Sequence, residues 1–115
     1  MEENIKVLFK PVGQPWENRT IRNSWEDLHD LVEGFIEYVR ISDHLALVVN
    51  DCGAINDMHL NFMWGSHFIF GPAVMVGIDG PETTSCWLDA SDLNVPRYYP
   101  KDDYLVEDPG EEAQS

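Results

Sequence analysis

The segment 23-NSWEDLHDLVEGFIEYVRISDHLALVVN-50 decides the fold of this chain. Its first part has apolar residues at helical spacing and acidic residues on the other face, which predicts a short amphipathic helix over residues 24–33. Its second part has two β-rich runs, residues 35–41 and 45–50, joined by the polar residues 42–44, as in a hairpin. The segment therefore indicates one helix that leads directly into an antiparallel pair of strands.

Both ends of this helix carry recognisable capping residues. Asn23 and Ser24 are good N-caps, and Glu26 lies three residues after Asn23, as in a capping box. Gly34 stands where a left-handed C-cap would end the helix. We therefore expect the helix to begin at Ser24 and to end at Glu33, with Gly34 in the left-handed conformation.

Other parts of the chain predict a mostly antiparallel sheet around this segment. Further β-rich runs occupy residues 5–9, 19–22, 67–70 and 73–78, and residues 87–93 predict a last short helix. Residues 54–65 fit either a short helix or an ordered loop, and Gly71 with Pro72 is typical of a bulge or an edge. The order predicts an α+β fold. We expect a single small domain over residues 1–100, with one amphipathic helix packed on one face of the sheet, and a mobile acidic tail over residues 101–115.

The composition fits one folded domain with a strong negative charge. The chain has 115 residues, 43% of them hydrophobic, which suits one compact core. Seven basic residues against 21 acidic ones give a net charge of −14, and residues 1–100 alone hold 15 acidic against six basic residues. Such a chain has no basic footprint for direct binding to nucleic acid or to anionic lipid. No apolar run approaches the ~20 residues that cross a bilayer, so we expect no contact with a membrane.

Two features favour a cytoplasmic location. The N-terminal residues 1–4 include two glutamates and no basic residue, where a signal peptide would be basic. Cys52 and Cys86 are far apart in sequence and form no C-x-x-C motif, which favours two separate thiols over a disulfide. We therefore expect a cytoplasmic protein, and the sequence leaves open whether both thiols are free.

Four stretches resemble a known family: NSWEDL at 23–28, LVEGFIE at 31–37, LALVVNDCG at 45–53, and Asn61. They are similar to the family called Domain of Unknown Function 3846, whose members are small domains from phages, plasmids and bacteria. The family pattern has a short helix, a V-G-G-x-I-E turn into a strand, an l-v-x-N-E-x-G turn, an L-P-x-N step and an apolar strand. The similarity runs over residues 5 to 80.

The chain departs from this pattern at three places. Glu33 replaces the first glycine of the pair, Asp51 replaces the usual glutamate, and residues 59–62 replace a Leu-Pro-x-Asn-Arg step. The resemblance implies a mobile-element origin. It implies no settled activity, so it assigns no catalytic residue to this chain.

Motifs of known enzyme or metal chemistry are absent from the sequence. The four histidines form no H-x-x-x-H or H-E-x-x-H pair, and no cysteine lies at metal-ligand spacing from them. Surface or core positions explain these histidines more readily than ligand roles. A nucleophile elbow, a Walker loop and a dinucleotide-binding loop are missing as well. We expect a protein that is not an enzyme, without catalytic residues, a metal site or a cofactor.

The aromatic residues divide between core and contact roles. Trp25, Phe68 and Phe70 are predicted to lie in the core. Trp64 and the pair Tyr98 and Tyr99 stand beside polar or loop sequence. At these three positions a structural role and a contact surface are equally good interpretations, because aromatic side chains anchor interfaces.

The first hypothesis for function is a non-enzymatic acidic binding protein of phage or mobile-element type. Its partner would be a host or defence protein with a basic surface. A nucleic-acid mimic would inhibit that partner by presenting carboxylates where phosphates bind. The predicted partner-binding residues converge around the helix and the following strand: Glu26, Asp27, Asp30, Glu33 and Glu37. The sequence leaves the oligomeric state open.

The alternative is a domain that binds or sequesters a small ligand, such as a nucleotide or a signal molecule. Its predicted ligand-binding residues are Asn50, Asp51, Gly53, Asn61 and Trp64. A structural interpretation competes with this one, in which Asn50 and Gly53 adopt positive φ and Asn61 ties down a loop. In a third hypothesis the acidity serves solubility alone.

Overall fold

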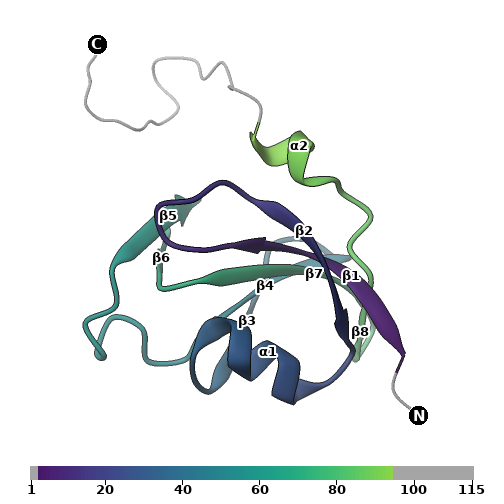
Figure 1. Cartoon of the computed structure of the whole chain (residues 1–115), viewed down its shortest axis with the longest axis horizontal. Helices are drawn as coiled ribbons and strands as arrows, with labels where there is room; N and C mark the ends of the chain where they lie inside the picture. The colour runs from purple at the N-terminus through teal and green to yellow at the C-terminus, as the bar shows by residue number, and fades with distance from the viewer. Residues whose placement is uncertain (1–2, 95–115) are drawn as a thin grey trace.

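The computed structural model describes residues 3–94, and Figure 1 shows their α+β arrangement, as the sequence predicts. The predicted tail at 101–115 and the pair Tyr98 and Tyr99 lie outside the described residues. In chain order the elements are β1 (Asn4–Lys10), β2 (Glu17–Arg22), α1 (Trp25–Val32), β3 (Ile36–Arg40), β4 (Leu45–Asn50), β5 (Leu60–Trp64), β6 (His67–Phe70), β7 (Ala73–Asp79), β8 (Glu82–Thr84) and α2 (Ala90–Asn94).

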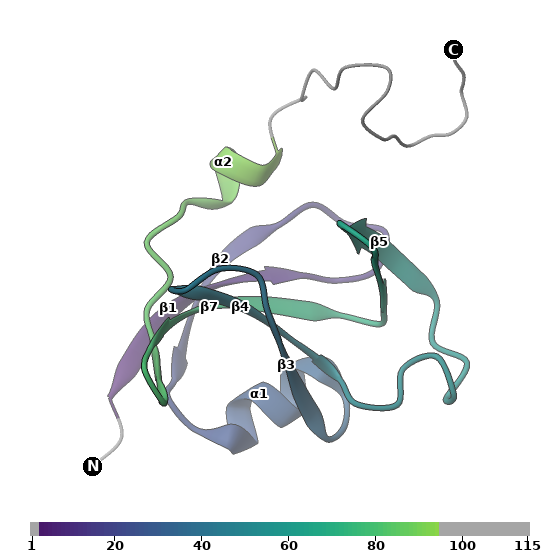
Figure 2. The same ribbon diagram turned by 180° about the vertical axis from the view of Figure 1, so that it is seen from behind.

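Strand β7 lies at the centre of the main sheet. The strand order is β2-β1-β7-β4-β3, and β8 pairs with the C-terminal end of β7. Strands β5 and β6 form a separate two-stranded sheet, and all of these described pairings are antiparallel. Figures 1 and 2 show α1 on one side of the main sheet and α2 on the opposite side.

Alternate residues of the sheet build two hydrophobic layers. On the face of α1, Val74 and Val76 of β7 belong to one buried cluster with Leu28 of the helix. On the other face, Met75 belongs to a second cluster with Ile69 of the β5–β6 hairpin. Burial of a side chain of this size contributes roughly 1.5–3 kcal/mol. A slip of one residue in β7 would exchange the two layers, so both of them fix its register.

Helix α1 confirms Ser24 as the N-cap, without the predicted capping box of Asn23 and Glu26, and corrects the predicted C-cap. The Ser24 hydroxyl accepts a hydrogen bond of 3.3 Å from the backbone N–H of Asp27. At the other end Glu33, rather than Gly34, adopts the left-handed conformation, with φ of 66° and ψ of 36°. The helix therefore ends one residue earlier than expected, because position 33 already reverses the chain.

The ambiguous stretch 54–65 contains a strand rather than a helix. Strand β5 pairs with β6 around Gly65 and Ser66, and Gly65 has a φ of 60°. Gly71 and Pro72 lie between β6 and β7, so they connect the two sheets instead of interrupting one β-rich region.

Two of the three aromatic residues that we expected in the core are exposed. Trp25 is 58% exposed and Phe68 is 59% exposed, whereas Phe70 is half-buried. Trp25 stands at the solvent side of the first helical turn. Phe68 precedes the buried Ile69, so the alternation of the strand turns its ring away from the core. Trp16 is buried in their place.

The two cysteines occupy different environments. Both thiols are free, with Cys52 exposed and Cys86 buried in the second cluster. Burial raises the pKa of the Cys86 thiol above its usual range. This buried group therefore stays neutral at physiological pH, as an apolar core residue would.

Candidate functional site

The solvent face of α1 carries three exposed carboxylates. Glu26 and Asp30 are one helical turn apart, and Glu33 follows at the end of the helix. In the part of the chain that the structure describes, no Lys or Arg forms a salt bridge with any of the three. His29 Nδ1 lies 3.9 Å from Asp30 Oδ1, and all three carboxylates remain exposed to an outside cation.

Asp27, the fourth predicted acid of the helix, already has a structural partner. Its carboxylate accepts hydrogen bonds from the Arg22 guanidinium at 2.6 Å and from the Arg22 backbone N–H at 2.9 Å. The Arg22 side-chain hydrogen bond is the largest cause that holds the pKa of Asp27 below its ordinary value. Asp27 thus ties the end of β2 to α1.

Three aromatic rings lie against one another beside the acidic face of α1. The His29 ring meets Trp25 edge-on, with centroids 5.4 Å apart, and meets Phe35 in the same way at 5.7 Å. Phe35 is 75% exposed and Trp25 is 58% exposed. We call Trp25, His29 and Phe35 the aromatic row. Tryptophan and phenylalanine are enriched in protein interfaces relative to the rest of the surface.

Glu37 does not join the acidic face of α1, contrary to the expected convergence. Its neighbour Ile36 packs on the hydrophobic layer under the helix. Since successive side chains of a strand point to opposite faces, Glu37 projects from the other side of the sheet. There it lies near Val39 and Val49, in a groove described below.

The cations within residues 3–94 already have partners inside the fold. The Lys6 ammonium donates to the carbonyls of Cys86 and Leu88. Lys10 contacts Asn61, and Arg19 contacts Glu17 and the Phe9 ring. Arg22 pairs with Asp27, and Arg40 donates to the Asp43 carbonyl. Most carboxylates of this region remain on the surface without such a cation, and the outer surface is strongly anionic.

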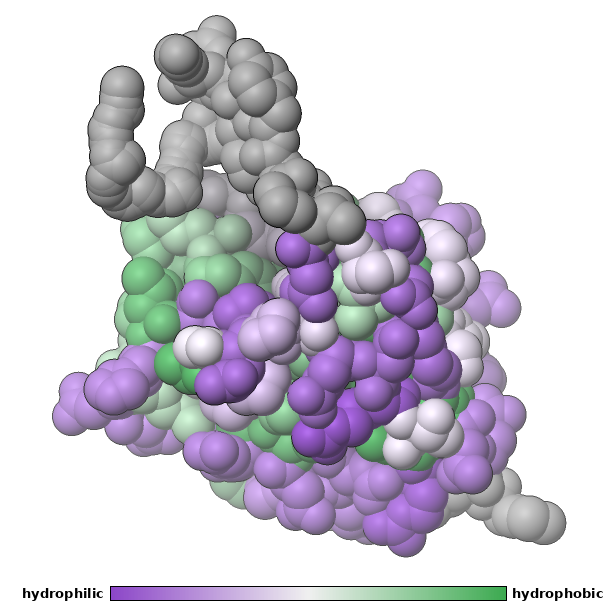
Figure 3. All heavy atoms as spheres, turned by 45° about the horizontal axis from the view of Figure 1, so that its top comes forward, coloured by the Kyte–Doolittle hydropathy of each residue, from purple (hydrophilic) through white to green (hydrophobic). Residues whose placement is uncertain are grey.

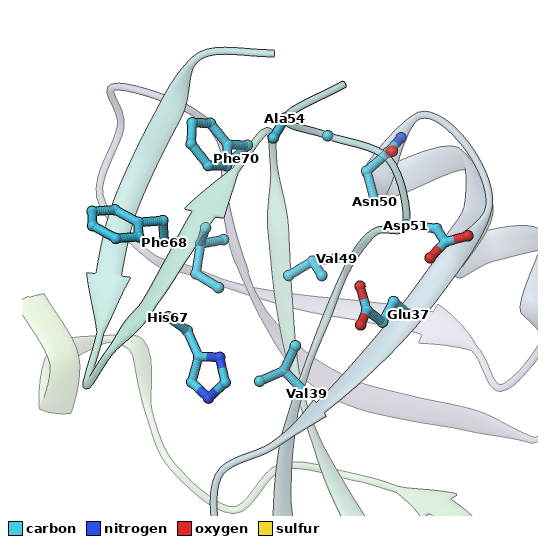
Figure 4. A pocket seen from close by; sticks show the side chains of 11 residues that line it. Glu37, Val39, Val49, Asn50, Asp51, Ala54, His67, Phe68 and Phe70 are labelled. Carbon is cyan, nitrogen blue, oxygen red and sulfur yellow. The ribbon is translucent and has the colours of Figure 1, made fainter. Parts of the chain in front are cut away.

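A groove of about 240 Å³ separates the β3–β4 hairpin from the β5–β6 hairpin. Figure 4 shows Glu37 and Asp51 on the side of β3 and β4, with His67 on the opposite side. Its apolar lining residues include Val39, Val49, Ile69, Phe68 and Phe70. The groove therefore combines an apolar base with two carboxylates at one rim.

The five residues predicted to bind a small ligand are divided by the structure. Asn50, Asp51 and Gly53 line the groove, whereas Asn61 and Trp64 do not. The positive φ expected at Asn50 and Gly53 is not observed. Gly53 is instead required for space, since a Cβ there would lie 2.8 Å from the Phe70 carbonyl oxygen.

The amides of Asn50 and Asn61 are already engaged with the backbone. Asn50 Nδ2 donates to the carbonyls of Val32 at 3.1 Å and Glu33 at 3.3 Å, and its Oδ1 accepts from the N–H of Cys52. Asn61 ties down its loop as expected: its Nδ2 donates to two backbone carbonyls, each at 2.9 Å, and its Oδ1 accepts from a lysine ammonium. These groups have little capacity left for a ligand.

Apolar side chains also gather on the outside of the β5–β6 hairpin. Leu60, Met63 and Phe68 are each at least half exposed. Figure 3 shows an apolar area at the left of the view, on the side where Figure 1 places β5 and β6, next to a mostly hydrophilic surface. Trp64, a candidate contact residue, is half-buried and packs on the second cluster instead.

Metal clusters and membrane-spanning helices are both absent from residues 3–94. This part of the chain contains no group of three or more His, Cys, Asp or Glu side chains placed to hold a metal ion. It also contains no helix with the length and apolar character needed to cross a bilayer.

Sequence comparison confirms the family that the chain resembles. The model of the family described as Domain of unknown function (DUF3846) matches residues 5–93, which includes all elements from β2 to β8. This chain belongs to the DUF3846 family. The DUF3846 match extends beyond β7 to the helix α2. Comparison with curated proteins and with solved structures gave no significant match.

The groove residues from the β5–β6 hairpin were missed at the level of sequence. The signal was present, because Gly65 and Ser66 separate two β-rich runs, and a two-residue Gly-Ser link is typical of a hairpin. That hairpin would have placed His67 and Phe68 next to the main sheet.

Proposed function

We propose that this DUF3846 domain is a non-enzymatic binding protein of a phage or another mobile element, which docks the solvent face of α1 on a basic surface of a host or defence protein. The observation that carries this proposal is the aromatic row beside the exposed acids of the helix. Interfaces combine large aromatic anchors with charged groups that select the partner.

The two parts of this surface have different roles in the proposal. Trp25 and Phe35 supply apolar area, which becomes favourable when a partner removes it from water. Glu26 and Asp30 supply negative charge that steers a basic partner into place. The His29 ring lies between the other two and contacts each of them edge-on, which fixes their positions.

In its sharpest form, the proposal is nucleic-acid mimicry. The net charge of −14 and the succession of carboxylates along α1 support it, because a groove built for phosphates attracts any dense negative surface. The alternative of a small-ligand domain has less support, since the amides of Asn50 and Asn61 are committed to the backbone.

Affinity capture with matched charge variants tests the docking face. The tagged full chain would be incubated with host lysate at low and at high salt, beside the double variant Glu26→Lys with Asp30→Lys. The control, Asp79→Lys with Glu82→Lys, makes the same change in net charge on exposed residues of the β7–β8 turn. We expect a salt-sensitive partner that the α1 variant loses and the control retains.

A second measurement separates mimicry from simple docking. The partner captured by the wild-type chain would be bound to a labelled DNA or RNA duplex, and the domain would be added in competition. Displacement of the duplex by the wild type and by the control, but not by the α1 variant, supports mimicry. Equal capture by all three chains contradicts docking through α1. Docking that leaves the duplex in place contradicts mimicry alone.

A further inference from the structure

Strand β3 forms an open edge of the main sheet. The Asp51 N–H donates to the Phe35 carbonyl, and the Ile41 N–H donates to the Leu45 carbonyl, so both positions bond toward β4. Antiparallel ladders alternate between inward and outward positions. The backbone N–H and C=O groups of Ile36, Tyr38 and Arg40 must therefore point away from the sheet.

The opposite edge of the sheet, at β2, is covered near its two ends. Asp27 accepts from the backbone N–H of Arg22, and the Arg22 carbonyl accepts from the N–H of Ser24. The Asn18 side chain binds Asp89 and Ala90 at the start of α2. Covered edges are the usual protection against unwanted strand pairing. Over residues 3–94 no hydrogen bond reaches the outward backbone groups of β3.

The groove lies over the face of the sheet next to this open edge. Glu37 and Val39 of β3 line it, and His67 of β6 stands across from them (Figure 4). A strand added beside β3 would place every second side chain on this face, about 5 Å from Glu37 or Val39. The edge would supply backbone hydrogen bonds, and the groove would supply side-chain selectivity.

The charges of the site define the chemistry of the added strand. Glu37 and Asp51 are exposed carboxylates at the rim, while Val39, Val49 and Ile69 present apolar surface. This pattern suits a segment in which a lysine or arginine lies next to an apolar residue on the same side. A second copy of the chain is a poor occupant, because each copy carries a charge of −14.

We propose that the β3 edge and its groove bind an extended segment of a partner protein, rich in basic and apolar residues, as an additional β-strand. This site is separate from the α1 face, because Glu37 and the helix lie on opposite sides of the sheet. If the β3 edge binds no such segment, the proposed docking through α1 is unaffected. If α1 proves not to dock on a partner, the proposal for β3 is likewise unaffected.

Hydrogen exchange of the full chain with a defined peptide tests the proposal. The probe is a blocked seven-residue peptide, Lys-Lys-Val-Val-Lys-Lys-Val, in which lysine and valine follow one another along each face of the strand. One control peptide carries N-methyl groups on every amide, so that neither of its edges can donate hydrogen bonds, and another has glutamate in place of lysine. At a tenfold excess over Kd, we expect exchange at the Tyr38 and Arg40 amides to slow about tenfold. The two control peptides should leave this exchange unchanged.

Protein variants locate the interaction. Glu37→Lys should weaken binding of the lysine–valine peptide about three- to tenfold, whereas the matched variant Glu82→Lys should have little effect. In the α1 variant with Glu26→Lys and Asp30→Lys, the peptide should still slow the exchange of the β3 amides.

Three results would overturn the proposal. One is equal protection by the N-methylated peptide, which would indicate charge attraction without strand pairing. Another is a change in amide exchange, on addition of the peptide, that is confined to α1. The last is protection of Tyr38 and Arg40 that rises with protein concentration without peptide, which would assign the edge to a second copy.

Discussion

The side-chain nitrogen of Asn50 lies 2.6 Å from the point where a Cβ on Gly34 would stand. Gly34 therefore leaves the space through which this amide reaches the last carbonyls of α1. The pattern of the family has a glycine pair here, and the two positions have different requirements. Position 33 needs a positive φ, whereas position 34 needs the absence of a side chain.

Loss of the Asn50 amide should destabilise the domain. Asn50→Ala removes two hydrogen bonds to backbone carbonyls from a buried site, and we expect the free energy of unfolding to fall by about 2–3 kcal/mol in urea. Asn56→Ala, at an exposed position, should change it by less than about 0.5 kcal/mol. Gly34→Ala should cost less in the Asn50→Ala background than alone, since the clash is then gone. Additive effects would contradict this coupling.

Replacement of Glu33 by glycine should stabilise the domain. A non-glycine residue in the left-handed region costs about 1 kcal/mol, so Glu33→Gly is expected to raise the free energy of unfolding by roughly 0.5–1 kcal/mol. The control Glu26→Gly lies within the helix and should lower it by about 1 kcal/mol. Thermal unfolding of the two variants measures both values. A loss of stability in Glu33→Gly would show that its side chain has another role.

Asn61 should control how firmly the β5–β6 hairpin is attached to the main sheet. Its amide joins the carbonyls of Lys10, at the end of β1, and Gly71, in the connection from β6 to β7. Asn61→Ala should cost about 2 kcal/mol and should accelerate exchange of the β5 and β6 amides more than that of the β7 amides. Uniform acceleration across all strands would mean that the hairpin does not open separately.

The start of α2 should respond to acid. Hydrogen bonds from Ser91, and then from Asn18, lower the pKa of Asp89 to about 2, against an ordinary value of 3.8. A depressed carboxyl pKa stabilises the fold above pH 4, and this contribution is lost as the pH falls from 4 towards 2. The Ser91 amide signal in NMR should therefore titrate near pH 2. In Asp89→Asn this titration should vanish, and a midpoint near 4 in the wild type would refute the assignment.

Local sequence patterns predicted most of the fold. Helix α1, the β3–β4 hairpin and the strands β1 and β7 follow from periodicity and capping, which act over a few residues. Strand β5 was missed, because residues 54–65 mix polar and apolar positions without a clear period. The N-cap of α2 was also missed, although Asp89 and Asp92 show the reciprocal spacing of a capping box.

The candidate site was harder to predict than the fold. Sequence shows that Glu37 follows the acidic helix, but only its strand parity reveals that it faces the groove. Trp25 fits a helical apolar stripe, yet the sheet extends under Leu28, Leu31 and Val32 and not under Trp25, so its ring stays in water. Such outcomes depend on where the sheet ends, which no local pattern records.

The central position of β7 has a consequence for synthesis of the protein. β1 and β4 both pair with a strand that is translated later than either of them. Until residues 73–79 leave the ribosome, the earlier strands lack the element that joins them, and their apolar faces stay uncovered. Nascent chains that end before residue 73 should accordingly be digested rapidly by protease, whereas chains that expose α2 should resist. The domain completes its fold late in translation, when its middle strand arrives.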